Sequence, residues 1–218
     1  GTINLAASGS TVNFNGGFTF GSANVPSFQT VSGSNLNIGG NLSVSPIALT
    51  LTSGSNTVFT GNSTVTPTAP ITFSNLQINS GITVSLAGDV TVGGNWTNNG
   101  GTLSAASRTI TFTGSSSNIN GTSGSSFPNI ILADGANYTM STNNTAASLT
   151  FEQSSSASGF THSGSASLTV SGNVVMNEPS TTATTGWNIN TGSASVGGDF
   201  SLGGTNSTAS FINQVIVI

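Results

Sequence analysis

The sequence predicts an all-β protein, and specifically a parallel β-solenoid, in which short strands coil around one axis. Three observations lead to this prediction. Charged residues are nearly absent, apolar and polar residues alternate with a period of two along most of the chain, and glycine-rich turn signals recur at related intervals. We expect one elongated β domain over residues 1–218, with residues 211–218 as an apolar terminal strand.

Charge is the scarcest property of the chain. Only 3% of the 218 residues are charged, whereas about a quarter are charged in an ordinary soluble domain. Arg108 is the single basic residue apart from His162, and five acidic residues give a formal net charge of −4. Binding to nucleic acid or to an anionic membrane surface requires several basic side chains, so the composition excludes both.

The same composition bears on metals and cofactors. The chain has no cysteine and one histidine, which excludes a disulfide framework and a zinc site of the usual kind. The acidic residues form no cluster of the kind that calcium needs. The sequence therefore predicts no metal site and no cofactor.

Alternation of apolar and polar residues defines the strands. Inward-facing Val, Ile, Leu and Phe are each followed by Thr, Ser or Asn, the pattern of a strand with one buried face. Helix-favouring residues are rare and glycine interrupts most windows of ten, so we expect little or no helix. The clearest alternating segments are 11–14, 18–20, 35–38, 41–44, 71–73, 76–78, 82–86, 90–92, 110–112, 149–151, 168–170 and 200–202.

Turn signals with a recurring form separate these segments. Gly-Gly-Asn begins at Gly39 and at Gly93, and related versions begin at Ser171 and Gly197. The intervals between successive marks are close to two, three and one multiples of a period of about 26 residues. A period of this length fits three short strands and three turns, which predicts about eight turns of a solenoid.

The predicted solenoid explains why charge is not needed. Each strand pairs with the equivalent strand of the next coil, about 4.8 Å away, and this pairing satisfies the backbone groups. Outward Thr, Ser and Asn then form ladders along the axis, whereas stacked identical charges would repel. An antiparallel β-sandwich, immunoglobulin-like or pilin-like, is the alternative fold, because its strands also alternate.

One stretch of the sequence resembles a known group of proteins. It contains Phe73-Ser74-Asn75-Leu76-Gln77-Ile78, then Leu86-Ala87-Gly88-Asp89-Val90-Thr91-Val92, then Gly94-Asn95-Trp96-Thr97-Asn98-Asn99-Gly100, then Ile110-Thr111-Phe112-Thr113-Gly114. The stretch resembles the β-solenoid repeats of secreted bacterial surface proteins, the filamentous-haemagglutinin-like and autotransporter-type adhesins. The resemblance implies a right-handed parallel β-helix located outside the cell or on its surface.

The C-terminal segment is the best functional lead. It is the most apolar window of the chain and contains no charge, Pro or Gly. Such a strand either pairs within its own fold or docks on a second subunit by strand addition. We expect the joint between subunits to include residues from both ends of the chain: Phe211, Ile212, Val215, Ile216, Val217 and Ile218, with Ile3, Leu5, Val12 and Phe14.

These observations favour a non-enzymatic extracellular structural protein. It would be a subunit of a self-assembling surface fibre, sheath or adhesin, and its main partner would be further copies of itself. The chain begins Gly1-Thr2-Ile3 and has no run of about 20 apolar residues, so we expect an exported, mature or excised product without a membrane-spanning segment.

Two other functions remain open from sequence alone. The first is a carbohydrate-binding or polysaccharide-cleaving β-helix, in which Trp96 and Trp187 contact sugar and Glu152 and Glu178, which are one proposed period apart, form an acid pair. A cell-surface or matrix polysaccharide would then be a partner. The second is an ice-binding solenoid, suggested by Thr109, Thr111 and Thr113, although no regular Thr-x-Thr row repeats at the proposed period.

Overall fold

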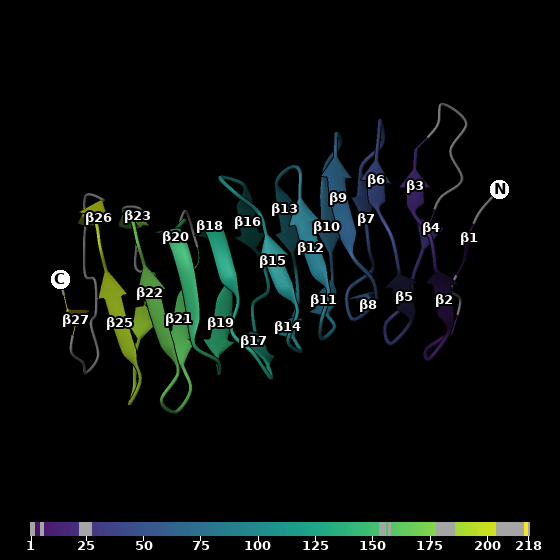
Figure 1. The fold of residues 1–218 in the computed structure, drawn as a ribbon. Helices are drawn as coiled ribbons and strands as arrows, with labels where there is room; N and C mark the ends of the chain where they lie inside the picture. Colours follow the sequence, from purple (N-terminus) through teal and green to yellow (C-terminus); the bar gives the residue numbers. More distant parts are fainter. Residues whose placement is uncertain are drawn as a thin grey trace.

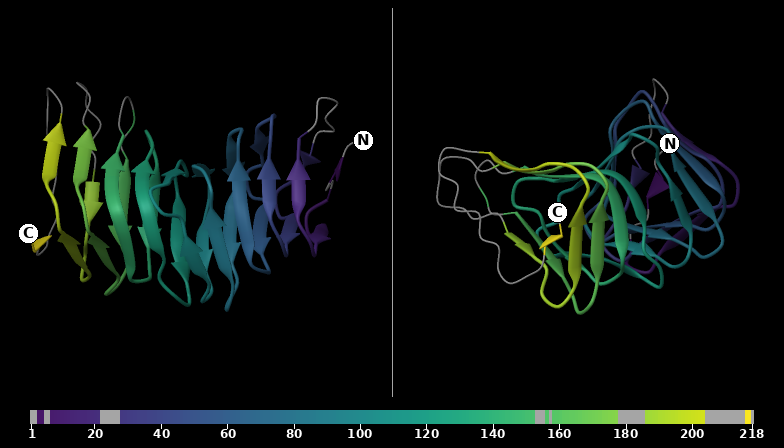
Figure 2. Two further views of the ribbon diagram at one scale, coloured as in Figure 1. Left: turned by 45° about the horizontal axis from the view of Figure 1, so that its top comes forward. Right: turned by 60° about the vertical axis from the view of Figure 1, so that its left-hand side comes forward.

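The computed structural model is a parallel β-solenoid of about eight turns (Figure 1). It describes residues 3–4, 7–21, 28–152, 156, 158–177, 186–203 and 216–217. The coils stack along one axis, so the first and last described strands lie at opposite ends of the molecule (Figure 2). In the described residues every recorded strand pair is parallel, and no helix occurs that could cross a membrane. The parallel pairing contradicts the β-sandwich alternative.

Three long sheets and one short strand pair run along the axis. The nine-stranded sheet contains β2 (Thr11–Phe14), β5 (Asn35–Ile38), β8 (Asn56–Phe59), β11 (Asn75–Ile78), β14 (Trp96–Asn98), β17 (Ser117–Gly121), β19 (Asn137–Met140), β21 (Gly159–His162) and β24 (Gly186–Asn188). The five-stranded sheet contains β3 (Phe18–Phe20), β6 (Leu42–Val44), β9 (Ser63–Pro67), β12 (Thr83–Leu86) and β15 (Thr102–Ser104). The short pair joins β1 (Ile3–Asn4) to β4 (Phe28–Gln29).

The eleven-stranded sheet covers one side in the first half and two sides in the second. Its strands are β7 (Leu49–Thr50), β10 (Ile71–Phe73), β13 (Val90–Val92), β16 (Thr109–Phe112), β18 (Ser126–Leu132), β20 (Asn144–Phe151), β22 (Ser167–Val170), β23 (Val174–Asn177), β25 (Ser193–Val196), β26 (Phe200–Gly203) and β27 (Ile216–Val217). The long strand β20 pairs with β22 through its first part and with β23 through its last part. It therefore spans a corner that two separate strands occupy in the next coil.

The coils differ in length, and this corrects the proposed uniform period. Hydrogen-bonded neighbours in successive coils are separated by 19 positions at Asn56 and Asn75, but by 26 at Asn173 and Asp199. The longer step thus matches the proposed period only near the C-terminal end. The mark at Gly39 follows a strand of the nine-stranded sheet, whereas the mark at Gly93 precedes one, so these two turns are not equivalent.

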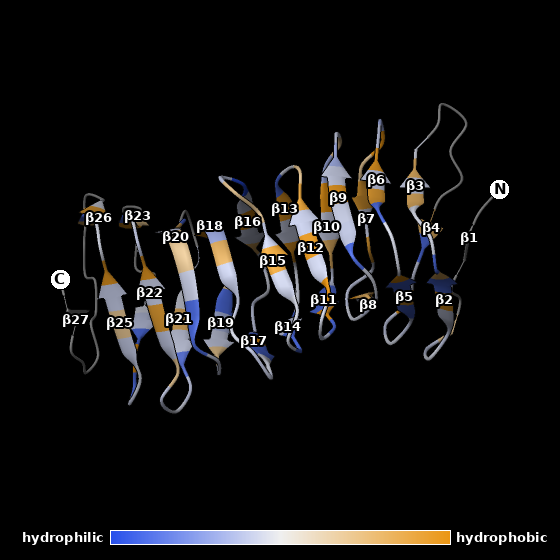
Figure 3. Ribbon diagram, viewed as in Figure 1, coloured by the Kyte–Doolittle hydropathy of each residue, from blue (hydrophilic) through white to orange (hydrophobic). Residues whose placement is uncertain are grey.

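The core is a narrow column of apolar side chains, as the alternation predicted. In β5, for example, Leu36 and Ile38 are buried, and Asn35 and Asn37 lie on the outer surface. Figure 3 shows the resulting mixture of orange and blue along individual strands. Buried aromatic rings pack together in the middle coils, where Phe112 contacts Phe127 and Tyr138 at ring-centroid distances of 5.8 and 4.8 Å.

Glycine pairs allow the coils to stack closely at corners. A Cβ atom on Gly40 would lie 2.6 Å from the carbonyl carbon of Gly16 in the coil below, and one on Gly198 would lie 2.8 Å from that of Gly172. No side chain fits at such a distance, so these corners require glycine.

Side-chain amides and carboxylates tie neighbouring coils together beside these corners. The Oδ1 atom of an Asn or Asp accepts the backbone N–H of a residue one coil further on, at 2.8–3.0 Å. We call these contacts corner bridges. They join Asn41 to Thr64, Asn62 to Thr83, Asp89 to Thr109, Asn95 to Asn118, Asp134 to Ser156, Asn143 to Ser167 and Asn173 to Asp199.

Candidate functional site

The N-terminal edge of the nine-stranded sheet is formed by β2. Val12 and Phe14 are half-buried and pack against the core, and the Phe14 ring stacks on Phe18 with centroids 4.4 Å apart. Ile3 lies in β1, opposite Phe28. Leu5 is outside the described residues. The structure thus places Val12 and Phe14 at one end of the solenoid.

The backbone of β2 has one side that faces away from its neighbour. The carbonyl oxygens of Ser10 and Phe14 accept N–H groups of the next coil, from Asn35 and Gly39. Alternate residues of a parallel strand face alternate neighbours, so the N–H and C=O of Thr11 and Asn13 point to the other side. No described strand pairs with β2 on that side.

The C-terminal strand pairs within its own chain where the structure describes it. Ile216 and Val217 form β27, which lies parallel to β25 opposite Ala194 and Ser195. The other predicted joint residues of this segment, Phe211, Ile212, Val215 and Ile218, are outside the described residues. In its own sheet β27 is a terminal strand, as β24 is in the nine-stranded sheet.

The two tryptophans are core residues, which corrects the predicted sugar contact. Trp96 and Trp187 are each 1% exposed. The indole N–H of Trp96 donates to Ser125 Oγ at 3.0 Å, and that of Trp187 donates to His162 Nε2 at 2.9 Å. A sugar platform needs an exposed ring face, and neither tryptophan presents one.

His162 is also a buried structural residue. Its Nε2 accepts the Trp187 N–H, so Nδ1 carries the proton and donates to the Ala166 carbonyl oxygen at 3.1 Å. Burial lowers the pKa of His162 below its ordinary value, although the Ala166 carbonyl opposes this shift. The neutral imidazole is therefore the form that fits this site.

Tyr138 is a second buried hydrogen-bonding group. Its hydroxyl accepts the Gly114 N–H at 3.1 Å and lies 3.0 and 2.9 Å from the carbonyl oxygens of Val92 and Gly94. Burial raises the pKa of Tyr138 to about 12, and the hydrogen bonds to Gly114 and Ser117 oppose the rise. Both titratable groups thus hold coils together.

A row of amide and hydroxyl side chains follows the outer surface of the nine-stranded sheet. We call it the amide column, and register and hydrogen bonds align its members: Thr11, Asn35, Asn56, Asn75, Asn95, Asn118, Thr139, Thr161 and Asn188. Asn56 Nδ2 donates to Asn35 Oδ1 at 3.0 Å, and Asn75 Nδ2 donates to Asn56 Oδ1 at 3.1 Å. This is a ladder of the predicted kind, but unequal coil lengths hide its full extent in the sequence.

A second row lies on the eleven-stranded sheet. Thr50, Thr72, Thr91 and Thr111 are direct neighbours in four successive coils, followed by Ile131 and Thr150. We call it the threonine column. The column is one residue wide, and its steps of 22, 19 and 20 residues are shorter than the proposed period of about 26, so that period does not reveal it.

The described acidic residues are dispersed. Asp89 and Asp134 form corner bridges. Glu152 is exposed, and Glu178 lies outside the described residues. No group of three His, Asp or Glu side chains able to hold a metal ion occurs in the described part of the chain.

Comparison with protein-family models, curated proteins and solved structures finds no match.

Two kinds of surface define the candidate site. The first consists of the terminal strands, whose backbone can pair with further strands. The second is the outer face of the nine-stranded sheet, where uncharged donors and acceptors line up along the axis.

Proposed function

We propose that this chain is a non-enzymatic extracellular structural protein, a subunit of a surface fibre, sheath or adhesin. Its copies join end to end, and parallel strands pair across the joint. The outward-facing N–H and C=O groups of Thr11 and Asn13 on β2 are the observation that carries the proposal. An edge of this kind is a template for strand addition.

Side chains at the two ends support the same joint. Val12 and Phe14 leave apolar surface at the N-terminal edge that a further coil would cover. At the other end Asp199 occupies, one coil on, the position of Asn173, whose Oδ1 accepts the Asp199 N–H. A coil added beyond Asp199 would find a carboxylate placed as the acceptor of the next corner bridge.

The joint reuses the contacts that hold the coils together inside one copy. Head-to-tail pairing of unlike ends does not close on itself, so it propagates into a filament. Dispersed acids with structural roles and buried tryptophans support a structural function over a catalytic one.

Asn13→Pro tests the joint directly. Proline removes the outward N–H of residue 13 and is tolerated at a strand edge, so we expect the variant to fold and to form no fibres by electron microscopy and sedimentation. Asn13→Ala is the matched control, because it also removes the amide that accepts Asn37 Nδ2 at 2.7 Å but keeps the N–H. Unchanged fibres from Asn13→Pro, or from a chain lacking residues 211–218, would refute the joint.

Ice binding is a second candidate, and the threonine column is the observation that favours it. Four neighbouring threonines present hydroxyl and methyl groups at the strand spacing of about 4.8 Å. Thermal hysteresis of the purified chain measures this activity. We expect Thr91→Tyr to abolish it and Thr83→Tyr, on the five-stranded sheet, to preserve it. A hysteresis near zero in the unchanged protein would eliminate this candidate.

A further inference from the structure

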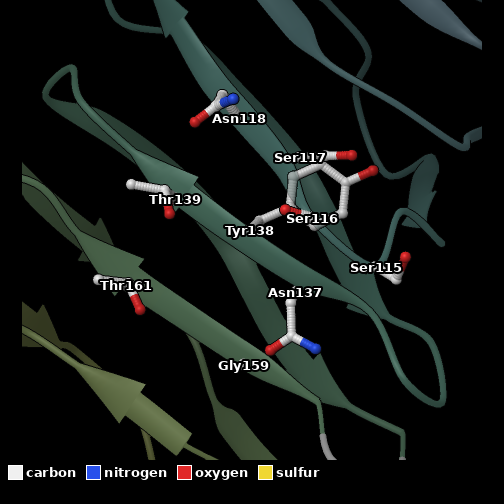
Figure 4. A pocket seen from close by; sticks show the side chains of 9 residues that line it. All are labelled: Ser115, Ser116, Ser117, Asn118, Asn137, Tyr138, Thr139, Gly159 and Thr161. Atoms are coloured by element: carbon white, nitrogen blue, oxygen red, sulfur yellow. The ribbon is translucent and has the colours of Figure 1, made fainter. Parts of the chain in front are cut away.

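The outer face of the nine-stranded sheet carries two hollows on one line. The first, the amide hollow, has a volume of about 100 Å³ and is lined by Asn56, Asn75, Gln77, Asn95 and Thr97. The second, the serine hollow, has a volume of about 140 Å³ and is lined by Ser115, Ser117, Asn118, Asn137, Thr139 and Thr161 (Figure 4). Asn75 and Asn95 of the first hollow and Asn118, Thr139 and Thr161 of the second are successive members of the amide column.

A glycine shapes the serine hollow. Gly159 pairs with Asn137 on the neighbouring strand, and a Cβ atom at Gly159 would lie 2.4 Å from Asn137 Oδ1. Figure 4 shows the Asn137 amide beside Gly159, with Thr139 and Thr161 on adjacent strands. The Asn137 amide occupies the space that a side chain at position 159 would take, and it forms part of the wall of the hollow.

The amides keep hydrogen-bonding capacity after the ladder is formed. A carboxamide has two N–H donors and an oxygen with two lone pairs. Within the ladder, Asn56 donates one side-chain N–H to Asn35, and its side-chain oxygen accepts one N–H from Asn75. The remaining donor and acceptor are available to a ligand on the outer surface. Ser115 and Asn118 in the serine hollow are exposed, and Thr139 and Thr161 are half-buried.

We infer that this face binds an extended, neutral polysaccharide that lies along the solenoid axis. None of the residues that line either hollow is charged, so an ionic ligand finds no counter-charge there. A neutral glycan supplies repeated hydroxyl groups, each of which can donate and accept. Successive sugar units of one polysaccharide can contact successive coils of the protein. These weak contacts act together, which raises the overall affinity. This inference concerns the side of the solenoid and does not depend on end-to-end assembly.

Retention on insoluble cellulose, chitin and mannan tests the inference, with soluble polygalacturonate as an anionic competitor. The protein is first cleared by ultracentrifugation, so that sedimenting fibres are not counted as bound. We expect retention on at least one of the three neutral polymers and no displacement by polygalacturonate. Retention on none of them, or displacement by the anionic polymer, would overturn the inference.

The double variant Thr139→Val/Thr161→Val locates the site. Valine keeps the shape and strand preference of threonine but removes two hydroxyl groups from the serine hollow. Two lost hydrogen bonds predict retention that is about tenfold weaker. The matched control is Thr72→Val/Thr91→Val, an adjacent pair on the eleven-stranded sheet, which should bind as the unchanged protein does. Equal retention by all three proteins would exclude the serine hollow as a binding site.

Discussion

At the scale of single residues, the contact between His162 and Trp187 is the most sensitive to conditions. His162 is fully buried, and its Nε2 is the acceptor for the indole N–H. Protonation would place two N–H donors against each other. It would also leave a charge in the core, where Phe160 and Trp187 pack against the imidazole.

We therefore predict that acid weakens the C-terminal coils. The pKa of His162 is lower in the folded chain than the 6.5 of an unperturbed histidine. The unfolded chain then takes up the proton first, so stability is complete above about pH 6.5 and falls as the pH is lowered toward the folded-state pKa. Denaturant unfolding between pH 7.5 and pH 5 measures this effect, which is limited to about 1.4 kcal/mol per pH unit for one proton.

His162→Gln supplies the control for this prediction. Glutamine cannot gain a charge in this range, so the variant should be less stable overall but should show no loss between pH 7 and pH 5.5. A parallel decline in the variant and the unchanged protein would assign the effect to other groups.

The sequence could not place these residues. Trp96 and Trp187 lie beside Gly and Asn, which left both a sugar contact and packing at a corner possible, and each occupies an inward position of a short strand. The partners that satisfy the indole N–H groups are distant in sequence, since Ser125 follows Trp96 by 29 residues and His162 precedes Trp187 by 25. Such pairings depend on coil length, which local patterns do not encode.

At the scale of elements, the corner bridges explain why Asn and Asp precede so many strands. In the bridges to Thr64, Thr83 and Thr109, the oxygen accepts a backbone N–H from the first or second residue of a strand in the next coil. The bridges use Asn and Asp alike, which shows that the acceptor oxygen matters more than the charge.

Asn62 gives a direct test of this explanation. Its Oδ1 accepts the Thr83 N–H at 2.8 Å. We predict that Asn62→Leu lowers the free energy of unfolding by about 1 kcal/mol, because one bridge is lost. Asn62→Asp keeps the acceptor and should remain within about 0.5 kcal/mol of the unchanged protein. Equal destabilisation by the two changes, in denaturant titrations at pH 7, would contradict a role as acceptor.

The positions of the strands were the part of the fold that the sequence patterns predicted best. Alternation alone identified most strands, from Thr11–Phe14 to Phe200–Gly203, and in strands such as β5 it also gave the buried side. In β26 it did not, because Leu202 is 45% exposed. The pattern did not reveal that β18 and β20 each run across a corner, because Pro128 and Ala147 interrupt the period at that point. It also could not assign strands to sheets, since every sheet shows the same alternation.

At the scale of the whole molecule, each coil contacts mainly its two neighbours. Stability in such an array is a sum of coil and interface contributions, and terminal coils have one interface fewer. The middle coils also contain the cluster of Trp96, Phe112, Phe127 and Tyr138.

We predict that amide hydrogen exchange is slowest in the central coils and becomes faster toward both ends. Opening near the ends breaks fewer contacts than opening in the middle. Mass spectrometry of exchanged peptides should show the strongest protection for β13, β14 and β16, and weaker protection for β2 and β26. Uniform protection along the chain would indicate all-or-none unfolding instead.

Coil number was predicted well, although the individual coil lengths were not. A uniform period gave about eight turns, and unequal coils give about the same total. The core tolerates this variation because corners absorb added residues, whereas strand positions stay in register. Repeat spacing in a degenerate sequence thus estimates the size of a solenoid better than it aligns the coils.

The corner bridges also give the molecule a direction. In each of them the oxygen belongs to the earlier coil and the N–H to the later one, so one end presents acceptors and the opposite end presents donors. An assembly built from such units has chemically distinct leading and trailing tips. Subunits would then add to the two tips of the assembly at different rates. All subunits in one fibre would have the same orientation.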